Sequence, residues 1–277
     1  MMSTALPDIT AHEMTELAEM VRAVHGFDFS DYSKASLKRR IVRIMMIKKL
    51  SFSDLKYKLA DDPAFFQDFL EEITVNVTEM FRDPTFYRAL VHEVVPHLAV
   101  LEQVKIWSAG CSSGEEAYSF AILTDQCGLK DKTAVRGSDV NATVLKEARK
   151  GTYNLRNMKT YAENYQLCGL SGSLNNYFTT GYDTMTIQNE WKQNVLFTVH
   201  NLVSDPAFDE FNLISCRNVF IYFETSLQEH ILDIFYASLK PNGYLCLGSK
   251  ETIRSERFRR KFKSVNSKEN IYQKIAF

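Results

Sequence analysis

The spacing of hydrophobic residues along the chain changes near residue 75. Before that point apolar positions recur every three to four residues, which is typical of amphipathic helices. The capping-box pattern Thr10-x-x-Glu13 predicts the start of a first helix, and Gly26 predicts its end. No strand is expected before Val104. Residues 1–75 therefore predict a small all-helical domain, with further helices at about 36–50, 53–60 and 63–73.

From residue 76 onward, short apolar runs alternate with helical periodicity. A long helix is expected from Asp83-Pro84 to about Ala99. Strands are then predicted at 104–108, 133–138, 212–216 and 244–248, and helices at 115–127, 141–150 and 225–239. This alternation is typical of a parallel sheet covered by helices, so the predicted fold class is α/β. Pro241-Asn242-Gly243 predicts a turn before the strand at 244–248, and the segment FKSVNSKENIYQKI predicts a final hairpin.

The stretch from about 152 to 195 interrupts this alternation. Asn, Gly, Thr and Tyr are frequent there, and apolar and polar residues alternate weakly around Tyr177-Phe178-Thr179. We therefore predict a small β-subdomain that is inserted into an α/β domain spanning residues 76–277.

Composition narrows the class of protein. With 277 residues and 45% hydrophobic content, the chain can form one large α/β domain and a smaller one. It has neither an apolar run of transmembrane length nor a signal peptide, so we expect a cytoplasmic protein without membrane insertion. Five scattered cysteines, never spaced C-x-x-C, argue against a disulfide framework or a metal site. The net charge of −1 gives no general affinity for nucleic acid.

The segment VKIWSAGCSSGEEAYSF has the layout of a nucleotide-binding strand, loop and helix. Its glycines, Gly110 and Gly114, would let the backbone approach a ligand closely. Their G-x-x-x-G spacing is neither a dinucleotide fingerprint nor a phosphate loop. Glu115 and Glu116 would repel a pyrophosphate, so a ligand with hydroxyls or a positive charge fits better, and S-adenosylmethionine has both. The alternative is that the two acids only interact with the helix dipole.

Polar residues also follow the other predicted strands, where ligands of open α/β sheets bind. Asp139 ends the second strand, where it can accept both ribose hydroxyls, or it caps the helix that begins near Asn141. Asn201 could hydrogen-bond an adenine edge or simply occupy a turn. Arg217-Asn218 places polar groups beside the aromatic run 219–223, which a buried core strand does not explain.

Several motifs together are specific. The combination of Asn76-x-Thr78-x-x-x-Arg82, WSAGCSSGEEAYS, SDVN, HNL and CRNVFIYF resembles the chemotaxis-receptor glutamate methyltransferases, the CheR-type family. The resemblance covers nearly the whole chain. It implies an S-adenosylmethionine-dependent, Rossmann-like methyltransferase sheet with an N-terminal helical domain. It also implies an enzyme that forms methyl esters on glutamate side chains of methyl-accepting chemotaxis receptors, with S-adenosylhomocysteine as product and no metal.

The resemblance also implies which residues form the site. Contacts to the cofactor are expected from Asn76, Thr78, Arg82, Gly110, Glu115, Glu116, Asp139, Asn201, Leu202, Arg217 and Asn218. Of the two adjacent acids, Glu116 is favoured. Arg82 can hold the methionyl carboxylate by a bidentate pair, unless it forms a surface ion pair with Asp83 or Glu79.

The expected reaction needs no catalytic dyad, because a glutamate carboxylate is already ionised near neutral pH. Tyr222 is predicted to position the acceptor carboxylate through its hydroxyl, with Arg217 nearby, and these are the expected catalytic residues. The alternative for Tyr222 is an aromatic ring that only packs.

A basic helix indicates the docking surface. Seven basic residues and no acid lie between Lys34 and Lys49. One face of this helix is apolar, with Leu37, Ile41, Ile44 and Met45, and Arg39 and Arg43 project opposite. We expect Lys38, Arg39, Arg40 and Arg43 to dock on the acidic helical bundle in a receptor's cytoplasmic domain, as the family does. A merely solvated face is the alternative, and RNA is a weaker candidate.

The inserted stretch departs from family members that bind a receptor's C-terminal pentapeptide. Those carry a longer β-subdomain with a Gly-Tyr-Arg-like element, whereas here Gly181-Tyr182 is followed by Asp183. We therefore expect a monomer whose recognition of receptors is independent of the pentapeptide. The other classes that remain are a methyltransferase for RNA or a small molecule, whose usual Asn-Pro-Pro-Tyr and Pro-Cys elements are missing, and a cofactor-binding adaptor without turnover.

Overall fold

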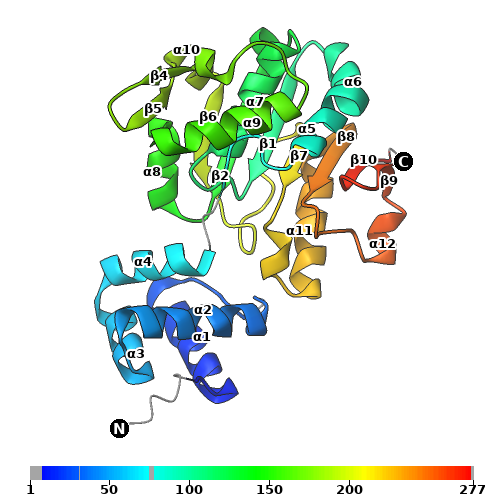
Figure 1. The fold of residues 1–277 in the computed structure, drawn as a ribbon. Helices are drawn as coiled ribbons and strands as arrows, with labels where there is room; N and C mark the ends of the chain where they lie inside the picture. The colour runs from blue at the N-terminus through cyan, green and yellow to red at the C-terminus, as the bar shows by residue number, and fades with distance from the viewer. Residues whose placement is uncertain (1–7, 31, 75–77, 276–277) are drawn as a thin grey trace. The chain divides into compact units, whose positions relative to one another are not determined.

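The computed structural model describes residues 8–30, 32–74 and 78–275 (Figure 1). The described chain divides into two compact units. One comprises Met1–Asn76 together with Ile221–His230, and the other comprises Val77–Phe220 together with Ile231–Phe277. The segment 221–230 thus belongs with the N-terminal helices, although it lies far from them in sequence. We call the two parts the helical unit and the sheet unit.

The helical unit contains the four helices expected from periodicity: α1 (Ala11–His25), α2 (Lys34–Lys48), α3 (Phe52–Asp61) and α4 (Pro63–Thr74). The capping box of α1 is formed, because Thr10 Oγ accepts from the Glu13 amide at 3.2 Å and the Glu13 carboxylate accepts from the Thr10 amide at 2.8 Å. Gly26 ends α1 in the left-handed conformation, with φ 67°. The predicted apolar face of α2 is buried in the core of the unit.

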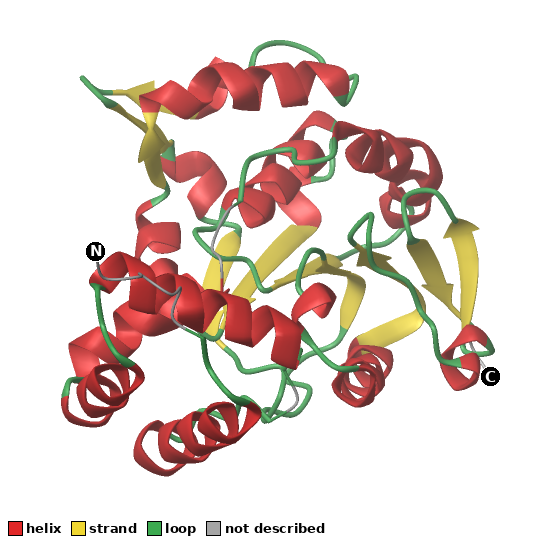
Figure 2. Ribbon diagram, turned by 60° about the horizontal axis from the view of Figure 1, so that its bottom comes forward, coloured by secondary structure: helices red, strands yellow, loops and turns green. Residues whose placement is uncertain are grey.

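In the described residues of the sheet unit, seven strands form one sheet in the order β6-β2-β1-β7-β8-β10-β9 (Figure 2, strands in yellow). The neighbours among β1, β2, β6, β7 and β8 pair in parallel, so these strands end at the same edge. The predicted hairpin, β9 and β10, pairs antiparallel and makes the sheet mixed. The strand bounds are Val104–Ala109 (β1), Thr133–Asp139 (β2), Val195–Val199 (β6), Phe211–Cys216 (β7), Leu239–Leu247 (β8), Phe262–Asn266 (β9) and Ile271–Lys274 (β10).

The expected turn at Pro241-Asn242-Gly243 is wrong. Strand β8 already begins at Leu239, and its pairing with β7 shifts register between Phe211 and Leu213. Asn242 has φ 61°, so these residues form an irregularity inside the strand. The pattern predicted a turn because Pro, Asn and Gly favour turns locally, whereas the neighbouring strand keeps both sides of the irregularity in one sheet.

The helices of the sheet unit also follow the predicted order. The long helix before β1 is a continuous run of α5 (Pro84–Ala89), a π-helical turn η1 (Leu90–Val94) and α6 (Val95–Ala99). Pro96 lacks an amide hydrogen, which accounts for the interrupted α-helical ladder there. The other helices wholly within this unit are α7 (Glu115–Gln126), η2 (Lys130–Lys132), α8 (Ala142–Lys150) and α12 (Glu256–Arg259), whereas η5 (Phe220–Tyr222) and α11 (Thr225–Ser238) each have residues in both units. The core includes Trp107, which lies fully buried on β1.

The inserted stretch is a mixture of strands and helices. Within the described residues it holds a small antiparallel sheet in the order β3-β5-β4, as expected, and also a helix, α9 (Met158–Leu167), which the sequence pattern did not indicate. The buried face of α9 consists of Tyr161 and Tyr165, so it lacks the aliphatic spacing that normally marks a helix. The other elements are β3 (Thr152–Asn154), η3 (Leu155–Asn157), η4 (Leu174–Tyr177), β4 (Phe178–Thr180), β5 (Thr184–Ile187) and α10 (Asn189–Lys192).

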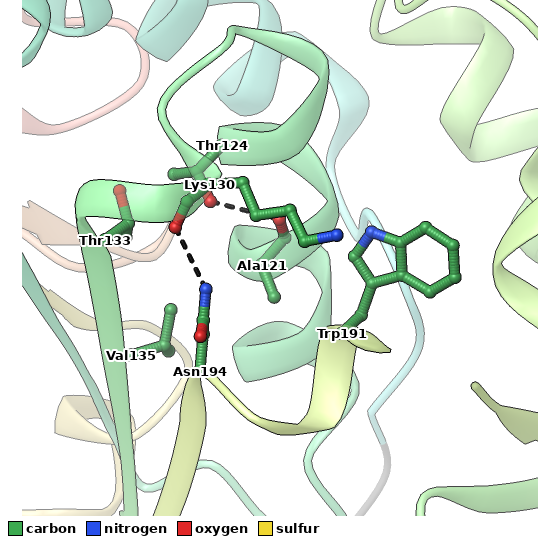
Figure 3. A pocket seen from close by; sticks show the side chains of 7 residues that line it. All are labelled: Ala121, Thr124, Lys130, Thr133, Val135, Trp191 and Asn194. Carbon is green, nitrogen blue, oxygen red and sulfur yellow. Dashed lines mark hydrogen bonds between the residues drawn. The ribbon is translucent and has the colours of Figure 1, made fainter. Parts of the chain in front are cut away.

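The end of the insertion is fastened to the turn before β2. Lys130 places its ammonium 4.9 Å from the centre of the Trp191 ring, and the Asn194 side chain donates to the Lys130 carbonyl at 2.9 Å (Figure 3). The hollow between these side chains has no room for a ligand. None of the described helices is long and apolar enough to cross a lipid bilayer.

Candidate functional site

The loop after β1 is held in shape by close packing of the chain on itself. Gly110 has φ 72° and Gly114 has φ 92°. A Cβ atom on Gly110 would lie 2.5 Å from a methyl group of Val219, and one on Gly114 would lie 3.0 Å from both Ala148 and Phe197. At both glycines the space that a Cβ atom would need is filled by the protein, and the close approach of this backbone to a ligand stays a prediction.

Asp139 fastens this loop to the end of β2. Its side chain is buried, and its two carboxylate oxygens accept backbone amides of Ser112 and Asn141, each at 2.9 Å. Burial raises the pKa of Asp139, and the hydrogen bonds from these amides act in the opposite direction. The cap of α8 is the Asn141 side chain, which accepts from the Thr143 amide at 2.8 Å. A carboxylate has about four acceptor positions, so Asp139 keeps capacity for further donors.

The two residues whose amides bind Asp139 also carry polar side-chain atoms without partners. The Ser112 hydroxyl and the Asn141 amide nitrogen are buried and have no hydrogen-bond partner in the described structure. Such atoms are uncommon in native proteins and call for an explanation. A hydroxyl and an amide donor beside a carboxylate form a set that a ribose diol can satisfy. The residues present at this edge therefore fit a nucleoside ligand.

A second cluster surrounds Arg217, which follows β7. The side chain is only 3% exposed, and it forms ion pairs with Asp83 at 2.7 Å and with Glu116 at 3.2 Å. The guanidinium also donates to the Arg82 carbonyl at 3.1 Å and stacks 4.0 Å over the Phe86 ring. Although burial acts to lower the pKa of Arg217, the nearby charges raise it, so the guanidinium stays protonated.

Glu116 is committed to the same cluster. Its second carboxylate oxygen accepts from the Ser108 hydroxyl at 2.8 Å. Glu116 therefore links β1 with Arg217 at the start of α7. The expected contacts of Glu116 and Arg217 with the cofactor remain predictions. In the structure both side chains bind other groups of the protein.

The turn that carries Arg82 has an unusual backbone. Phe81 and Asp83 have φ values of 53° and 58°, which cost on the order of 1–2 kcal/mol for residues other than glycine. Two contacts hold the turn: the Phe81 amide donates to the Ser119 hydroxyl at 2.9 Å, and Arg217 binds the Arg82 carbonyl. These contacts hold the backbone that carries the half-buried side chain of Arg82.

Glu115 belongs to a different environment from Glu116. It is buried and accepts from the Ser113 hydroxyl at 2.7 Å and from the Tyr161 hydroxyl at 3.3 Å. Burial raises the pKa of the Glu115 carboxyl to about 7. Tyr153 donates to the Ser113 carbonyl at 3.0 Å, so the insertion contacts this region through Tyr153 and Tyr161, neither of which belongs to a recognised motif.

The remaining expected cofactor residues lie at or near strand ends. Asn201 forms a turn, since its side-chain oxygen accepts the Val203 amide at 2.9 Å, and its adenine contact stays a prediction. Leu202 beside it is buried. Asn218 has φ 62° and donates its amide to buried Glu251 at 2.9 Å. Glu251 was not anticipated, because no motif contains it. Thr78 is half-buried, and Asn76 lies outside the described residues.

The predicted docking residues and Tyr222 lie in the helical unit, and they fall into separate groups. Arg39 and Arg43 are exposed, and neither forms an ion pair within the described ranges. Lys38 pairs with Asp8 at 2.7 Å. Arg40 instead lies over the Tyr222 ring, with its guanidinium carbon 4.3 Å from the ring centre. In the described part of the chain, no three His, Cys, Asp or Glu side chains gather as a metal site would require.

Known protein families match both parts of the chain. Residues 12–74 match the family model described as CheR methyltransferase, all-alpha domain, and residues 76–271 match the one described as CheR methyltransferase, SAM binding domain. Together the two matches run from residue 12 to residue 271.

Relatives of similar length are known from several bacteria. A Pseudomonas putida protein that carries the name methyltransferase Cher3 is 38% identical over 95% of this chain and 96% of its own length. The chemotaxis protein methyltransferase of Listeria monocytogenes is 30% identical over 90% of this chain and 92% of its own. That of Salmonella typhimurium is 29% identical over 86% and 82%.

The buried carboxyl of Glu115 predicts a pH dependence of stability. Its pKa rises from 4.5 to about 7 on folding. The stability it contributes is therefore present below pH 4.5 and lost as the pH rises to about 7, by about 3 kcal/mol. Glu115→Gln removes this ionisation but keeps hydrogen-bonding groups for Ser113 and Tyr161. We expect the unfolding free energy of the wild type minus that of the variant to fall by about 3 kcal/mol between pH 4.5 and 8.

Urea denaturation across this pH range measures the difference. Glu147→Gln, at an exposed position on α8, controls for the loss of a carboxylate. A difference between wild type and Glu115→Gln that does not change with pH would contradict the assignment of a buried, protonatable Glu115.

Proposed function

We propose a substrate for this chain, which belongs to the CheR methyltransferase family and is an S-adenosylmethionine-dependent methyltransferase. The substrate is the set of glutamate side chains in the cytoplasmic helical domain of methyl-accepting chemotaxis receptors. Relatives that span nearly the same length carry the name chemotaxis protein methyltransferase. The observation that carries the proposal lies in the matched cofactor-binding domain: Asp139 is bound by the amides of Ser112 and Asn141, whose hydroxyl and side-chain nitrogen have no hydrogen-bond partner in the described structure.

The proposed cofactor contacts divide according to the chemistry of each group. Asp139, with the Ser112 hydroxyl and the Asn141 amide, would hold the ribose hydroxyls. Arg82, presented by the strained turn, would hold the methionyl carboxylate by a bidentate pair. Asn201 would contact the adenine edge. When bound, the cofactor supplies an electrophilic methyl group on a sulfonium, whose positive charge suits the acidic start of α7.

The residues of this chain then have to bind and orient the acceptor, since a glutamate carboxylate with a pKa near 4.3 is already a nucleophile. Correct orientation of reacting groups can lower a barrier by about 7–11 kcal/mol. Tyr222 is the proposed contact for the acceptor carboxylate. Arg217 is only 3% exposed and ion-paired, so we assign it a positioning role through Asp83 and Glu116 in place of direct contact.

The proposed docking surface is the exposed side of α2. Arg39 and Arg43 stand one helical turn apart and have no ion-pair partner in the described part of the chain, so both are available to an acidic receptor helix. Recognition at this surface would be independent of a receptor's C-terminal pentapeptide. We place the protein in the cytoplasm, as a monomer that meets receptors from that side of the membrane.

The substrate proposal predicts a base-labile methyl label. Incubation with methyl-labelled S-adenosylmethionine and receptor cytoplasmic domains should transfer label to the receptor protein. Mild base should then release the label as methanol, because base hydrolyses methyl esters but does not remove methyl groups from amines. A label that survives base would point to another acceptor, and absence of turnover would make the chain a binding protein.

Arg82→Ala should weaken S-adenosylmethionine binding by roughly ten- to a hundred-fold, because a hydrogen bond to a charged group contributes about 1.5–3 kcal/mol. Calorimetric titration measures the change. Arg88→Ala, an exposed arginine on α5, is the matched control and should bind as the wild type does. An unchanged affinity for the Arg82 variant would remove it from the site.

The double reversal Arg39→Glu and Arg43→Glu should raise the KM for a receptor domain by at least tenfold, because like charges would then face each other. Reversal of Arg22 and Lys58, two exposed cations elsewhere in the helical unit, should change it little. A receptor domain that lacks its last five residues should be methylated at the full rate. Unaltered kinetics after the α2 reversal, or loss of activity on the shortened receptor, would overturn the docking model.

A further inference from the structure

We propose that Arg40 positions Tyr222 and takes no part in docking the receptor. The proposal rests on the function proposed above, in which Tyr222 contacts the acceptor carboxylate. It separates Arg40 from Arg39 and Arg43, which the basic pattern of α2 places in one group with it.

The contacts of Arg40 are directed at the protein. Its guanidinium lies over the Tyr222 ring, 4.3 Å from the ring centre, and also donates to the Ile73 carbonyl near the end of α4. The Arg40 side chain is half-buried, whereas Arg39 and Arg43 are exposed. Successive residues of a helix are about 100° apart, so Arg40 lies about 100° from Arg39 and about 60° from Arg43, at the flank of the stripe that these two exposed arginines share. Its cation is therefore engaged with an aromatic face.

The segment around Tyr222 is fastened to the same helix by its backbone. The Ser33 amide, immediately before α2, donates to the Tyr222 carbonyl at 2.8 Å. Next to it, Tyr32 bridges to Phe223, and their rings meet edge to face with centres 5.2 Å apart. Ser33 holds the main chain of Tyr222, and Arg40, two helical turns further along α2, holds its ring. Together these contacts fix where the phenol points.

The hydroxyl of Tyr222 remains available. It has no hydrogen-bond partner among the described residues, and the side chain is half-buried. A ring fixed on both sides with an uncommitted hydroxyl suits a group that must meet a carboxylate in one orientation. Because the docking stripe and Arg40 belong to one rigid helix, a receptor helix bound at Arg39 and Arg43 would be in register with Tyr222.

The inference predicts different kinetic effects for neighbouring arginines. In the full-length protein, with a receptor cytoplasmic domain as substrate, Arg40→Gln should lower kcat about tenfold and leave the KM for receptor within about twofold. Glutamine removes the cation and leaves a neutral polar amide at this half-buried position. Arg39→Gln and Arg43→Gln, the matched controls, should raise KM several-fold and leave kcat within about twofold.

Two further variants test whether the effect passes through Tyr222. Arg40→Lys should recover kcat to within about threefold of the wild type, because an ammonium also binds an aromatic face. In a Tyr222→Phe background, Arg40→Gln should cost no more than about twofold in kcat, since no hydroxyl remains to be positioned. Cofactor affinity and the melting temperature should stay at the wild-type values in every variant.

Two results would overturn the inference. One is a rise in KM for Arg40→Gln like that of Arg39→Gln, which would return Arg40 to the docking surface. The other is a double variant whose loss of kcat equals the product of the losses in Arg40→Gln and Tyr222→Phe, because the two residues would then act independently. Both results leave the proposed function intact, whereas absence of base-labile receptor methylation by the wild type would remove the function itself.

Discussion

The carboxyl edge of the sheet depends on one buried guanidinium. Arg217 forms ion pairs with Asp83, before α5, and with Glu116, at the start of α7. Glu116 also accepts a hydrogen bond from the Ser108 hydroxyl on β1. Removing Arg217 would leave the largely buried carboxylate of Glu116 without its cation, and breaking a buried pair in this way costs about 3–5 kcal/mol. The strained turn at Arg82 is held by the same guanidinium through its carbonyl. The proposed cofactor contacts are thus positioned by an interaction that does not itself need to reach the cofactor.

The loop after β1 is fixed from its other side by Asp139 and by the insertion. Asp139 accepts amides from the loop and from the start of α8, so the ends of β1 and β2 are joined by one carboxylate. Tyr153 and Tyr161 reach the loop from the insertion, at Ser113 and Glu115. Ser112 and Asn141, whose amides bind Asp139, each keep one side-chain polar atom without a partner in the described structure. A rigid surrounding with a few unsatisfied polar groups is what a preorganised ligand site requires.

In this proposal helix α2 both docks the receptor and positions Tyr222. Its exposed arginines are suited to an acidic partner, and its lateral Arg40 and the preceding Ser33 hold the segment around Tyr222. That segment leaves the sheet unit only four residues after Arg217 along the chain and belongs to the helical unit. Receptor binding and acceptor positioning are therefore properties of the helical unit in this proposal, while the cofactor belongs to the sheet unit.

Local pattern was sufficient for much of the fold. Periods of three to four residues predicted α1 to α4, and short apolar runs predicted the strands of the parallel sheet. Both patterns are local, because burial of one helix face or of a whole strand requires apolar residues at set positions within a short segment. The order of several motifs was enough to indicate the family. Where the local signal was weak or misleading, the predictions failed: α9 buries tyrosines in place of aliphatic residues, and Pro241-Asn242-Gly243 lies inside a strand.

Residue patterns along the chain indicated most of the elements, their order and the chemical types of residue at the strand ends. What each of those residues contacts depends on the folded chain. Gly110 is required by Val219, more than 100 residues away, and Glu115 and Glu116 differ because one faces the insertion and the other faces Arg217. Arg39 and Arg40 are adjacent and equally charged, yet only Arg40 meets Tyr222. The physical reason is that the burial, pKa and hydrogen-bond partners of a side chain depend on groups brought together from distant parts of the chain. The spacing of residues along the chain does not show which distant groups come together.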